Sequence, residues 1–486
     1  MFTVNRWVVR LIALPLAAAL GVLAPPGGAQ AAGETEIEAR WVALGGESGV
    51  LGAKLPPPDD VPHDVPGGRA QDFTGGSIYW SETTGAWDVR DAILAAYLAA
   101  GGPGGTLGFP TAAAEPVGTE GALRQVLTGG QIYWWAATGA HAVQGEVLAR
   151  YLAAGGAGSH LGLPTAAETA VAGGGRTVFQ GGHIYRSAAG ARIVSGAILR
   201  KYLAYGGPEG YFGMPTSDEA SAGPGARFMV FVRARIYWSP ATGADAVYGA
   251  ILKKYLAIGG PRSYLGLPTT SEYAINGGRR SRFVNGKITY YPGRGTTVAG
   301  TWRPAVKRVK AAEIPYTYRS GCPVGPARLR RVRMPYYDWS GVPRWGDLIV
   351  RTSAADDMRR VFKRAFSARF NIRQIRPVDV WRGSDIQAMA ADNTSAFNCR
   401  KVTGNPYRLS QHSYGNAIDI NTRENPYVTS SRVYPAGSET YLNRRKVRKG
   451  MIVASGPIAR AMRAEGWPWG ARWSHPDYQH FSSNGG

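Results

Sequence analysis

The sequence predicts a two-part chain, in which a repeat domain of about five units, each a β-hairpin with a short helix, precedes an α+β domain. Self-comparison of residues 41–296 shows a period of 51 to 56 residues. Residues 313–486 instead mix amphipathic helical patterns with short strand-like runs. Gly and Pro contribute 66 and 32 of the 486 residues, which excludes a mostly helical bundle and a coiled coil.

Residues 1–31 have the layout of a secretory signal peptide. Two arginines precede an apolar run from Leu11 to Ala24, and a small-residue cleavage site ends at Ala31. The run is shorter than the roughly 20 residues needed to span a bilayer, which argues against a retained anchor. We therefore expect a secreted protein with no transmembrane segment after cleavage.

Three short markers recur in the same order through residues 41–296, where Leu51 and Gly52 form a degraded first copy. They are a Leu- or Phe-Gly-x-Pro segment, an Ile-Tyr-Trp-like segment and a Tyr-Leu-Ala-x-Gly-Gly segment. The first begins at Leu107, Leu161, Phe212 and Leu265, the second at Ile78, Ile132, Ile184, Ile236 and Ile288, and the third at Tyr97, Tyr151, Tyr202 and Tyr255.

Each repeat is predicted to contain a short helix, a tight turn and two strands. Apolar residues from Ile93 to Tyr97 have helical spacing, and the Gly-Gly pair after them ends the helix because glycine adopts the left-handed cap conformation easily. The proline of Leu-Gly-x-Pro prevents a helix from continuing there. Gly75 and Gly76 fit a two-residue hairpin turn. One such unit buries little surface, so the units must pack together.

These units resemble the LGFP repeats of cell-wall proteins from mycolate-bearing actinobacteria. The resemblance implies attachment to the envelope through wall polysaccharide, with the units closed into a propeller-like ring. Aromatic rings on the hairpins are candidates for stacking on sugar faces, although alternation along a hairpin turns about half of them into the core. The candidates are Tyr79, Trp80, Tyr133, Trp134, Tyr237 and Trp238.

Charge is distributed unevenly along the chain. Residues 301–486 carry a net charge of +19 and residues 1–300 a net charge of +4. A basic half implies an anionic partner, such as nucleic acid, a lipid surface or an acidic polymer. Because the leader predicts export, we expect a wall polymer and no nucleic acid. The basic run Arg444–Lys449 then indicates either a cationic loop near that polymer or an ordinary solvated loop.

The α+β domain is predicted at residues 313–486, after a linker at residues 297–312 that lacks apolar periodicity. Ala354 to Phe370 forms an amphipathic helix, and a second helix runs from Pro457 to Glu465. Val378–Trp381 and Ala417–Asn421 are strand-like runs.

The chain has two cysteines, Cys322 and Cys399. In an exported protein an even pair indicates a disulfide, and two separate buried thiols are the alternative. Closing a loop of this length stabilises a fold by about 4 kcal/mol in the chain-entropy model.

Two segments near the C-terminus combine histidines with carboxylates. The chain has seven histidines, and His412, His475 and His480 lie in these segments. Asp419 lies on the polar face of a predicted strand, and the turn before it lets His412 fold back toward it. Two histidines and one carboxylate form a common catalytic zinc set, and a further carboxylate is then needed to move protons. The alternative is a buried His–Asp pair that only orders a loop.

This domain resembles the M15 zinc peptidases, which include D-alanyl-D-alanine carboxypeptidases and L-alanyl-D-glutamate endopeptidases. The matching residues are Ser410, His412, Gly415, Ala417, Asp419, Asp477, His480 and Phe481. The resemblance implies a hedgehog-like antiparallel sheet with helices, and one zinc ion per chain held by His412, Asp419 and His480. It also implies Asp477 as the general base and Arg400 as the group that stabilises the oxyanion. His475 is a rival ligand whose spacing fits the motif less well.

These observations predict a secreted, cell-wall-associated zinc metallopeptidase that acts as a monomer on peptidoglycan stem peptides. Residues 393–400 and 467–470 resemble the L-Ala–D-Glu endopeptidase branch, which favours that activity. The alternatives are a D-alanyl-D-alanine carboxypeptidase and a non-catalytic wall-binding protein with a relic peptidase fold. A nucleic-acid-binding protein is a further hypothesis that only the charge favours.

Overall fold

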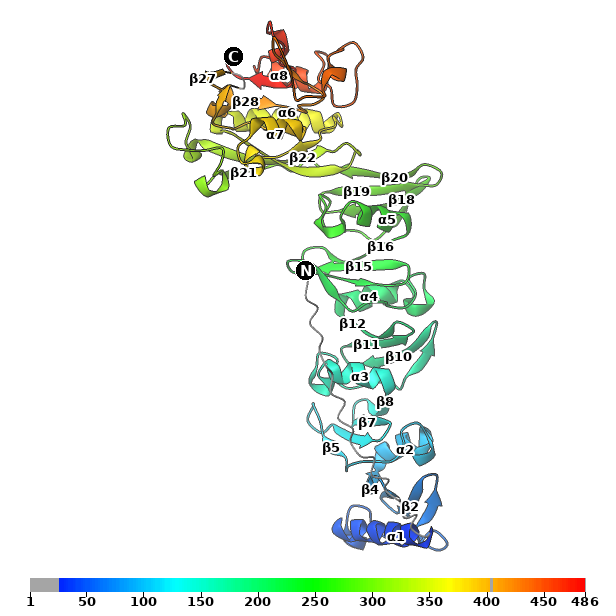
Figure 1. The fold of residues 1–486 in the computed structure, drawn as a ribbon. Coiled ribbons are helices and arrows are strands. Elements are labelled where there is room, and N and C mark those ends of the chain that lie inside the picture. Colours follow the sequence, from blue (N-terminus) through cyan, green and yellow to red (C-terminus); the bar gives the residue numbers. More distant parts are fainter. Residues whose placement is uncertain (1–25, 403–404, 486) are drawn as a thin grey trace, which may run out of the picture. The chain divides into compact units, whose positions relative to one another are not determined.

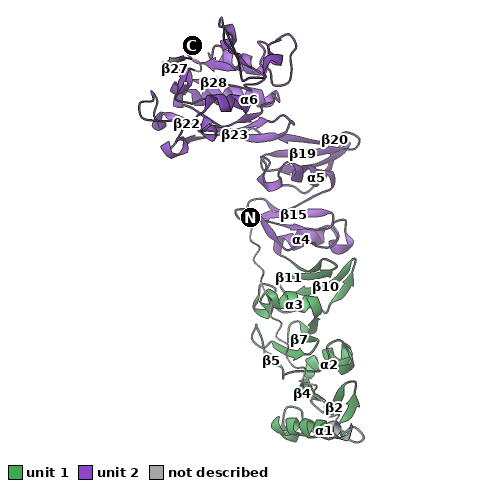
Figure 2. Ribbon diagram, viewed as in Figure 1, with its two compact units in different colours: residues 1–193 green, residues 194–486 purple. Residues whose placement is uncertain are grey.

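The computed structural model describes residues 26–402 and 405–485 (Figure 1). The chain divides into two compact units, residues 1–193 and 194–486 (Figure 2). This division differs from the predicted one, because the fourth and fifth repeats lie in the same unit as the C-terminal domain. A division by compactness does not test where the domains begin and end. The repeat domain at 41–296, the linker at 297–312 and the C-terminal domain at 313–486 remain predictions.

The predicted leader lies mostly outside the described residues, which begin with helix α1 (Pro26–Ala43). The predicted cleavage site after Ala31 lies within this helix. No helix in residues 26–402 and 405–485 is both long enough and apolar enough to cross a membrane.

Each repeat consists of a helix followed by a four-stranded antiparallel sheet, which is two strands more than the predicted hairpin. The helices after α1 are α2 (Asp91–Ala99), α3 (Gly145–Ala153), α4 (Gly196–Ala204) and α5 (Gly249–Ala257). The first two sheets are β1–β4 (His63–Val65, Gly68–Phe73, Gly76–Ser81, Gly85–Arg90) and β5–β8 (Glu115–Pro116, Leu123–Leu127, Gly130–Trp135, Gly139–Gln144). The others are β9–β12 (Thr169–Val171, Gly174–Phe179, Gly182–Ser187, Gly190–Ser195), β13–β16 (Ala220–Gly223, Ala226–Val230, Ala234–Ser239, Gly243–Tyr248) and β17–β20 (Tyr273–Ile275, Gly278–Phe283, Gly286–Tyr291, Gly295–Gly300).

Two of the sequence markers meet through a hydrogen bond in every repeat that carries both. The Tyr97 hydroxyl donates to the carbonyl oxygen of Gly108 over 2.7 Å, and Tyr151 donates to Gly162 over 2.6 Å. The same bonds join Tyr202 to Gly213 and Tyr255 to Gly266. The buried tyrosine of the helix therefore fixes the Leu-Gly-x-Pro turn that leads into the sheet.

The predicted hairpin turn is shifted by one residue. Phe73 pairs with Gly76, so Thr74 and Gly75 form the two-residue loop between β2 and β3. A Cβ atom on Gly75 would lie 2.7 Å from the carbonyl oxygen of Val50, so the close approach of two chain segments requires glycine there.

The prediction of a closed, propeller-like ring is wrong. Among the described residues every repeat sheet is open, and its four strands pair only with one another in chain order. Helices join consecutive repeats instead, since α2 packs on β3 and β4 of the first sheet and on β7 and β8 of the second. Packing of this kind buries the apolar faces of neighbouring repeats without closure.

Most of the aromatic residues proposed to bind sugar belong to the core. Tyr79, Trp80, Tyr133 and Tyr237 are at most 6% exposed. Tyr79 packs edge-on against Tyr97, with ring centroids 5.0 Å apart. Trp134 and Trp238 are half-buried and keep part of their rings at the surface.

The C-terminal domain is built on the three-stranded antiparallel sheet β21 (Ala305–Arg308), β22 (Leu329–Tyr337) and β23 (Pro343–Arg351). Its helices are α6 (Ala355–Ser367), α7 (Asp385–Ala390) and α8 (Pro457–Ala464). The apolar faces of α6 and α8 pack on β22 and β23, as the predicted amphipathic patterns require. The paired short strands are β24 (Gln374–Ile375) with β25 (Asn393–Thr394), β26 (Lys401–Val402) with β27 (Asn405–Leu409), β28 (Ala417–Asp419) with β31 (His480–Ser482), and β29 (Tyr427–Val428) with β30 (Val433–Tyr434).

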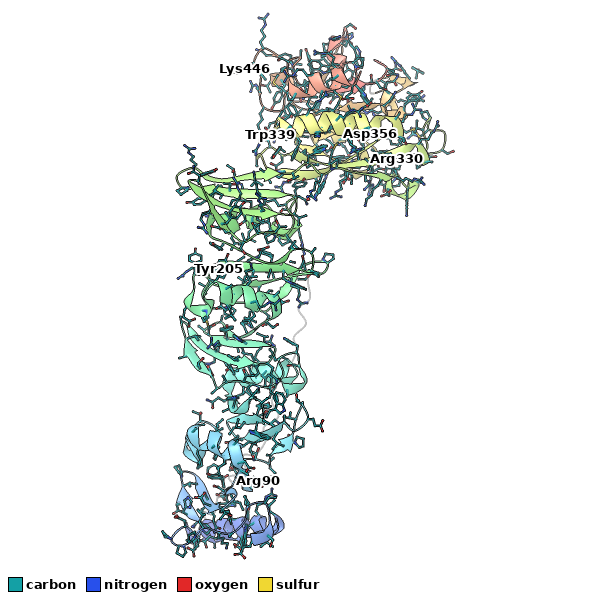
Figure 3. All side chains as sticks on the ribbon, turned by 180° about the vertical axis from the view of Figure 1, so that it is seen from behind. Arg90, Tyr205, Arg330, Trp339, Asp356 and Lys446 are labelled. Carbon is teal, nitrogen blue, oxygen red and sulfur yellow. A yellow bond between two sulfur atoms is a disulfide. The ribbon has the colours of Figure 1, made fainter. Side chains whose placement is uncertain are left out.

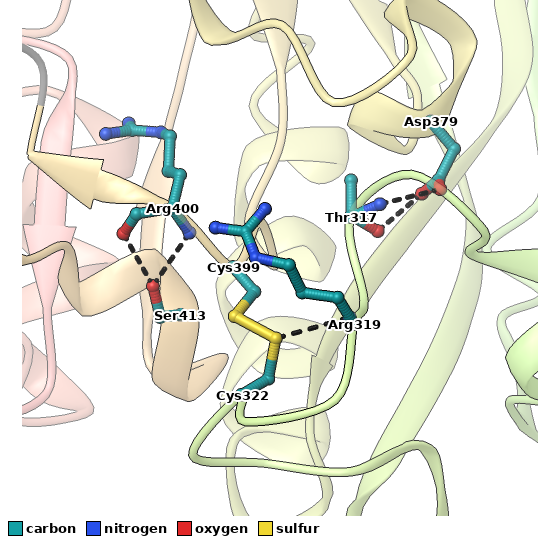
Figure 4. The surroundings of a disulfide bond; sticks show 7 residues. All are labelled: Thr317, Arg319, Cys322, Asp379, Cys399, Arg400 and Ser413. Atoms are coloured by element: carbon teal, nitrogen blue, oxygen red, sulfur yellow. Dashed lines mark hydrogen bonds between the residues drawn. A yellow bond between two sulfur atoms is a disulfide. The ribbon is translucent and has the colours of Figure 1, made fainter.

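Two segments differ from their predicted structure. Val378–Trp381 is a 3₁₀ turn rather than a strand, because Asp379 accepts hydrogen bonds from the backbone of Tyr316 and Thr317 and holds the segment in a bend (Figure 4). Residues 297–312, predicted as a linker, contain the end of β20 and the whole of β21. Only Thr301 to Pro304 lie between those two strands.

The fifth repeat packs directly on the C-terminal domain. Val342, directly before β23, belongs to the core of that repeat. The Tyr337 hydroxyl accepts a hydrogen bond from the backbone nitrogen of Gly300 over 3.2 Å, and the rings of Tyr264 and Trp345 lie 4.7 Å apart. The two parts therefore share a packed interface.

The basic run Arg444–Lys449 is partly structural. Arg444 donates hydrogen bonds to the Asn425 side chain and the carbonyl oxygen of Ile452, and its guanidinium lies 4.5 Å from the centroid of the Tyr478 ring. Burial lowers the pKa of Arg444 to about 10. This arginine therefore ties loops of the domain together, whereas Lys446, labelled in Figure 3, is exposed.

Candidate metal centre

Two short strands bring the predicted metal ligands together. Strand β28 pairs with β31, and this register places Asp419 directly opposite His480. Directly opposite residues of an antiparallel pair lie close together, so a separation of 61 residues in sequence becomes a contact. On the other side of β28, Asp419 forms a backbone bridge with Ser395, which holds the strand from both edges.

His412 reaches the same point from a one-turn 3₁₀ helix at Gln411–Tyr414. The Ser410 hydroxyl caps this turn by accepting a hydrogen bond from the backbone nitrogen of His412. Gly415 ends the turn with a φ of 67°, and a Cβ atom there would lie 2.7 Å from the backbone nitrogen of Arg351. The glycine is therefore required both by its conformation and by the close approach of β23.

The three candidate ligand side chains form one buried cluster. His412 Nε2 lies 3.1 Å from Oδ2 of Asp419, and His480 Nδ1 lies 3.0 Å from Oδ1 of the same carboxylate. The two ring nitrogens are 3.2 Å apart. All three residues are less than 9% exposed, and their ligand atoms lie within 4.8 Å of one another.

The donor set fits a zinc ion. His412 Nδ1 lies 2.5 Å from the carbonyl oxygen of Ala396 and donates to it, which leaves the Nε2 lone pair facing the cluster. A backbone acceptor of this kind is the usual means of fixing the tautomer of a metal-binding histidine. Two neutral imidazoles and one carboxylate then match the ligands of catalytic zinc sites, which keep a fourth position for water.

Electrostatics favour an ionised carboxylate in this cluster. Burial acts to raise the pKa of Asp419, but the charges and hydrogen bonds of His412 and His480 outweigh it and hold that pKa below its ordinary value. Burial likewise acts to lower the pKa of His412, and the charge of Asp419 outweighs it and raises that pKa. A positive charge is therefore favoured beside Asp419, and a metal cation would supply one.

Asp477 lies beside the cluster and is 8% exposed. Its backbone is held by a hydrogen bond to the carbonyl oxygen of Gly470 and by a bridge to Tyr427. Burial, and then the charge of Asp419, raise the pKa of Asp477 above its ordinary value. Among the described residues its Oδ1 atom has no hydrogen-bond partner, so this oxygen is available to a water molecule or substrate.

Arg400 follows Cys399, which forms the predicted disulfide with Cys322 (Figure 4). The backbone nitrogen and carbonyl oxygen of Arg400 both bond to the Ser413 hydroxyl, next to His412 (Figure 4). Its guanidinium lies 2.8 Å from the carboxylate of Asp385. Arg400 is thus fixed at the site by its main chain and oriented by an ion pair.

The cluster opens into a cavity of about 280 Å³. Arg400, Asp477 and the three ligand residues line it, and His475 lies at an exposed position on the same cavity. The His475 side chain is outside the group of three atoms that converge.

Sequence reasoning missed several lining residues. Asp385 and Arg408 carry charge into the cavity, and Tyr427 and Trp473 supply aromatic surface. Trp473 lies within the second histidine segment and could have been found there. Asp385, Arg408 and Tyr427 stand outside both motifs, and no pattern in the sequence distinguishes them from surface residues.

Comparison with known proteins gives two family matches. Residues 403–483 match the M15 peptidase model described as D-alanyl-D-alanine carboxypeptidase, and this segment contains all three candidate ligand residues and Asp477. The LGFP repeat model matches residues 55–105, 107–159, 161–210, 212–263 and 265–303, together just over half of the chain.

The chain belongs to the LGFP-repeat proteins, and its residues 403–483 match the M15 peptidase model.

The M15 match does not extend to Arg400 or to strands β21–β23. Among curated proteins none matches this LGFP-repeat protein. A solved structure described as "AfRom2 CNH domain" is 9% identical over 59% of this chain and 92% of that chain, with a TM-score of 0.12, which is too low to indicate a shared fold.

Proposed function

We propose that this chain is a secreted zinc metallopeptidase that hydrolyses peptide bonds in peptidoglycan stem peptides while its repeats hold it at the cell wall. One observation carries the proposal. Two imidazole nitrogens and one carboxylate converge in a buried cluster beside a second, unpaired carboxylate oxygen, all within the segment that matches the M15 model.

The side chains of the site divide the work of hydrolysis between them. When bound, zinc polarises the scissile carbonyl and lowers the pKa of a ligand water to about 7. Asp477, whose pKa is raised, takes the proton from the attacking water and returns it to the leaving amine. The Arg400 guanidinium, oriented by Asp385, stabilises the negative charge on the carbonyl oxygen.

The L-Ala–D-Glu endopeptidase activity is favoured by the motifs around residues 393–400 and 467–470. A D-alanyl-D-alanine carboxypeptidase is the second candidate, for a specific reason. A carboxypeptidase must bind the free carboxylate at the end of its substrate, and Arg400 and Arg408 both line the cavity. The matched family model also carries that description.

The repeats supply the location rather than the chemistry. LGFP repeats indicate association with the cell wall, and the leader-like residues 1–31 support secretion. The basic C-terminal half, with its net charge of +19, favours approach to an anionic wall.

Digestion of purified muropeptides, followed by mass spectrometry, tests the activity and names the bond. Loss of a single terminal D-Ala identifies the carboxypeptidase, and release of the stem peptide beyond L-Ala identifies the endopeptidase. Zinc content is measured on the same sample. A protein that holds zinc but cleaves neither bond would overturn the proposed activity and leave a wall-binding protein.

A further inference from the structure

A small cavity in the repeat domain is lined by both polar and aromatic side chains. It has a volume of about 370 Å³ and lies where the end of β4 and the start of α2 meet β6 and β7. Arg90, Asp91, Gln125 and Trp134 contribute its polar and aromatic surface, and Arg90 is labelled in Figure 3. Its size is within the range of small-molecule sites.

Asp91 has an unusual backbone conformation. Its φ is 52°, in the left-handed region that favours glycine. The three following repeats have Gly145, Gly196 and Gly249 at the same position, with φ values of 56°, 57° and 55°. This repeat therefore places a carboxylate where the others have no side chain, at a cost in backbone strain. Strain that a chain keeps at one of several equivalent positions indicates a use for the side chain.

Gln125 offers a second polar group at the cavity. Its side chain is fully buried, and Nε2 donates to the carbonyl oxygen of Ala112 over 2.5 Å. Within residues 26–402 and 405–485, its Oε1 atom has no hydrogen-bond partner. An unpaired buried carbonyl oxygen is costly unless a water molecule or a ligand hydroxyl donates to it.

The charges around the cavity balance. Asp88 is buried and pairs with both Arg40 and Arg90, at 2.6 Å and 3.0 Å. Asp91 has no ion-pair partner in the described part of the chain. The charged residues on the cavity wall are therefore one arginine, Arg90, and one carboxylate, Asp91, and the Arg40–Asp88 pair behind them is also balanced. A balanced site has no net attraction for an anion, which distinguishes it from the basic surface of the C-terminal half.

We propose that this cavity binds one neutral sugar residue of a wall polysaccharide, an inference that rests on the proposed attachment of the repeats to the wall. The half-buried ring of Trp134 supplies a flat apolar surface for a sugar face. The Asp91 carboxylate and Gln125 Oε1 accept hydrogen bonds from sugar hydroxyls.

The fourth and fifth repeats lack this combination. Beside Trp238, the equivalent positions are Gly196 and Met229, which offer no polar side chain. Beside Tyr290, they are Gly249 and Ser281. The first repeat keeps the glutamine as Gln71, whose Oε1 also lacks a hydrogen-bond partner among the described residues. The feature that sets the second repeat apart is therefore the Asp91 carboxylate beside Trp134, and Tyr290 provides a matched control aromatic residue at the same strand position.

The test uses isothermal titration of the full chain with oligosaccharides released by mild acid from protein-free bacterial wall polysaccharide. Anion exchange first separates them into neutral and anionic pools. The neutral pool is expected to bind, Trp134→Ala and Asp91→Gly are expected to weaken binding by about tenfold or more, and Tyr290→Ala is expected to leave it unchanged. Asp91→Gly should not lower the Tm, because glycine relieves the left-handed strain.

Each contrary result overturns the inference. These results are no binding of the neutral pool, binding of the anionic pool alone, equal losses in the Trp134 and Tyr290 variants, or wild-type affinity in Asp91→Gly. The peptidase assay on soluble muropeptides is separate. A chain that binds sugar without cleaving peptides contradicts only the proposed peptidase, and a chain that cleaves without binding sugar contradicts only this site.

Discussion

Asp419 and His480 face each other across strands β28 and β31, with Oδ1 of the carboxylate 3.0 Å from Nδ1 of the imidazole. The Asp419 carboxylate links all three residues of the candidate metal site, because His412 contacts its other oxygen. Replacing either residue removes a ligand and leaves the other partner buried without its contact.

His480→Ala is expected to lose the metal. Loss of a supporting partner already reduces metal affinity by about 10–100-fold, so loss of a ligand is expected to reduce it at least as much. Zinc per chain is measured by elemental analysis after dialysis. His475→Ala is the matched control and is expected to keep one zinc ion, since His475 lies outside the converging group. Equal zinc loss in both variants would make His475 a ligand.

Asp477→Asn is expected to keep zinc and to lose turnover. The amide cannot accept the proton of the attacking water, and general-base catalysis contributes about 10²–10⁴-fold. Muropeptide cleavage rates and zinc content are measured side by side. A variant with normal zinc and a rate within about threefold of the wild type would remove Asp477 from the mechanism.

Glu424 is expected to make the stability of the C-terminal domain depend on pH. Burial, and then the hydrogen bond and charge of Asp392, raise the pKa of Glu424 to about 8. A raised carboxyl pKa means that the folded state prefers the protonated form, so stability falls as the pH rises from the ordinary value of 4.5 toward 8. Glu424→Gln is expected to remove this decline in urea unfolding, and the exposed Glu439→Gln to retain it. A wild-type free energy of unfolding that rises over this range would contradict the assignment.

Reduction of the disulfide is expected to destabilise the domain. Cys322 and Cys399 are 77 residues apart, and opening a loop of that length costs about 4 kcal/mol in the chain-entropy model. The double Cys→Ser variant should therefore show a lower free energy of unfolding in denaturant. Wild-type protein titrated with reductant should converge on the same value, and a difference of less than about 1 kcal/mol would contradict the prediction.

Tyr151→Phe tests the bond that joins two repeat markers. The variant leaves the buried carbonyl oxygen of Gly162 without its donor, which costs about 1–3 kcal/mol. Tyr407→Phe is the control, because Tyr407 is 92% exposed. Equal free energies of unfolding for the two variants would show that the Tyr151 hydroxyl carries no stability.

Local patterns predicted the elements well and their assembly poorly. The apolar stripe of residues 355–367 and the recurring repeat markers are short-range signals, and both correspond to structure. The ring was wrong because closure depends on contacts between distant units, which a period in sequence does not contain. Val378–Trp381 was assigned by composition, whereas the Asp379 side chain decides its conformation.

The residues of the candidate metal site could be picked out from the sequence for a particular reason. His412 and Asp419 are held by one turn and one strand, so their spacing is a local property. The distant His480 was found only through its motif. Asp385 and Tyr427 could not be found, since their place at the cavity depends on how loops pack.

The four residues between β20 and β21 determine how far the catalytic site can range from its attachment. An extended segment of that length spans at most about 14 Å, and the interface at Tyr337 and Gly300 shortens the distance further. A long flexible linker would let the enzyme sample a large volume of wall. This chain instead holds the C-terminal domain against the fifth repeat, so the reach of the proposed peptidase would be set by where the repeats attach. Hydrolysis would then be limited to stem peptides next to the anchoring polymer.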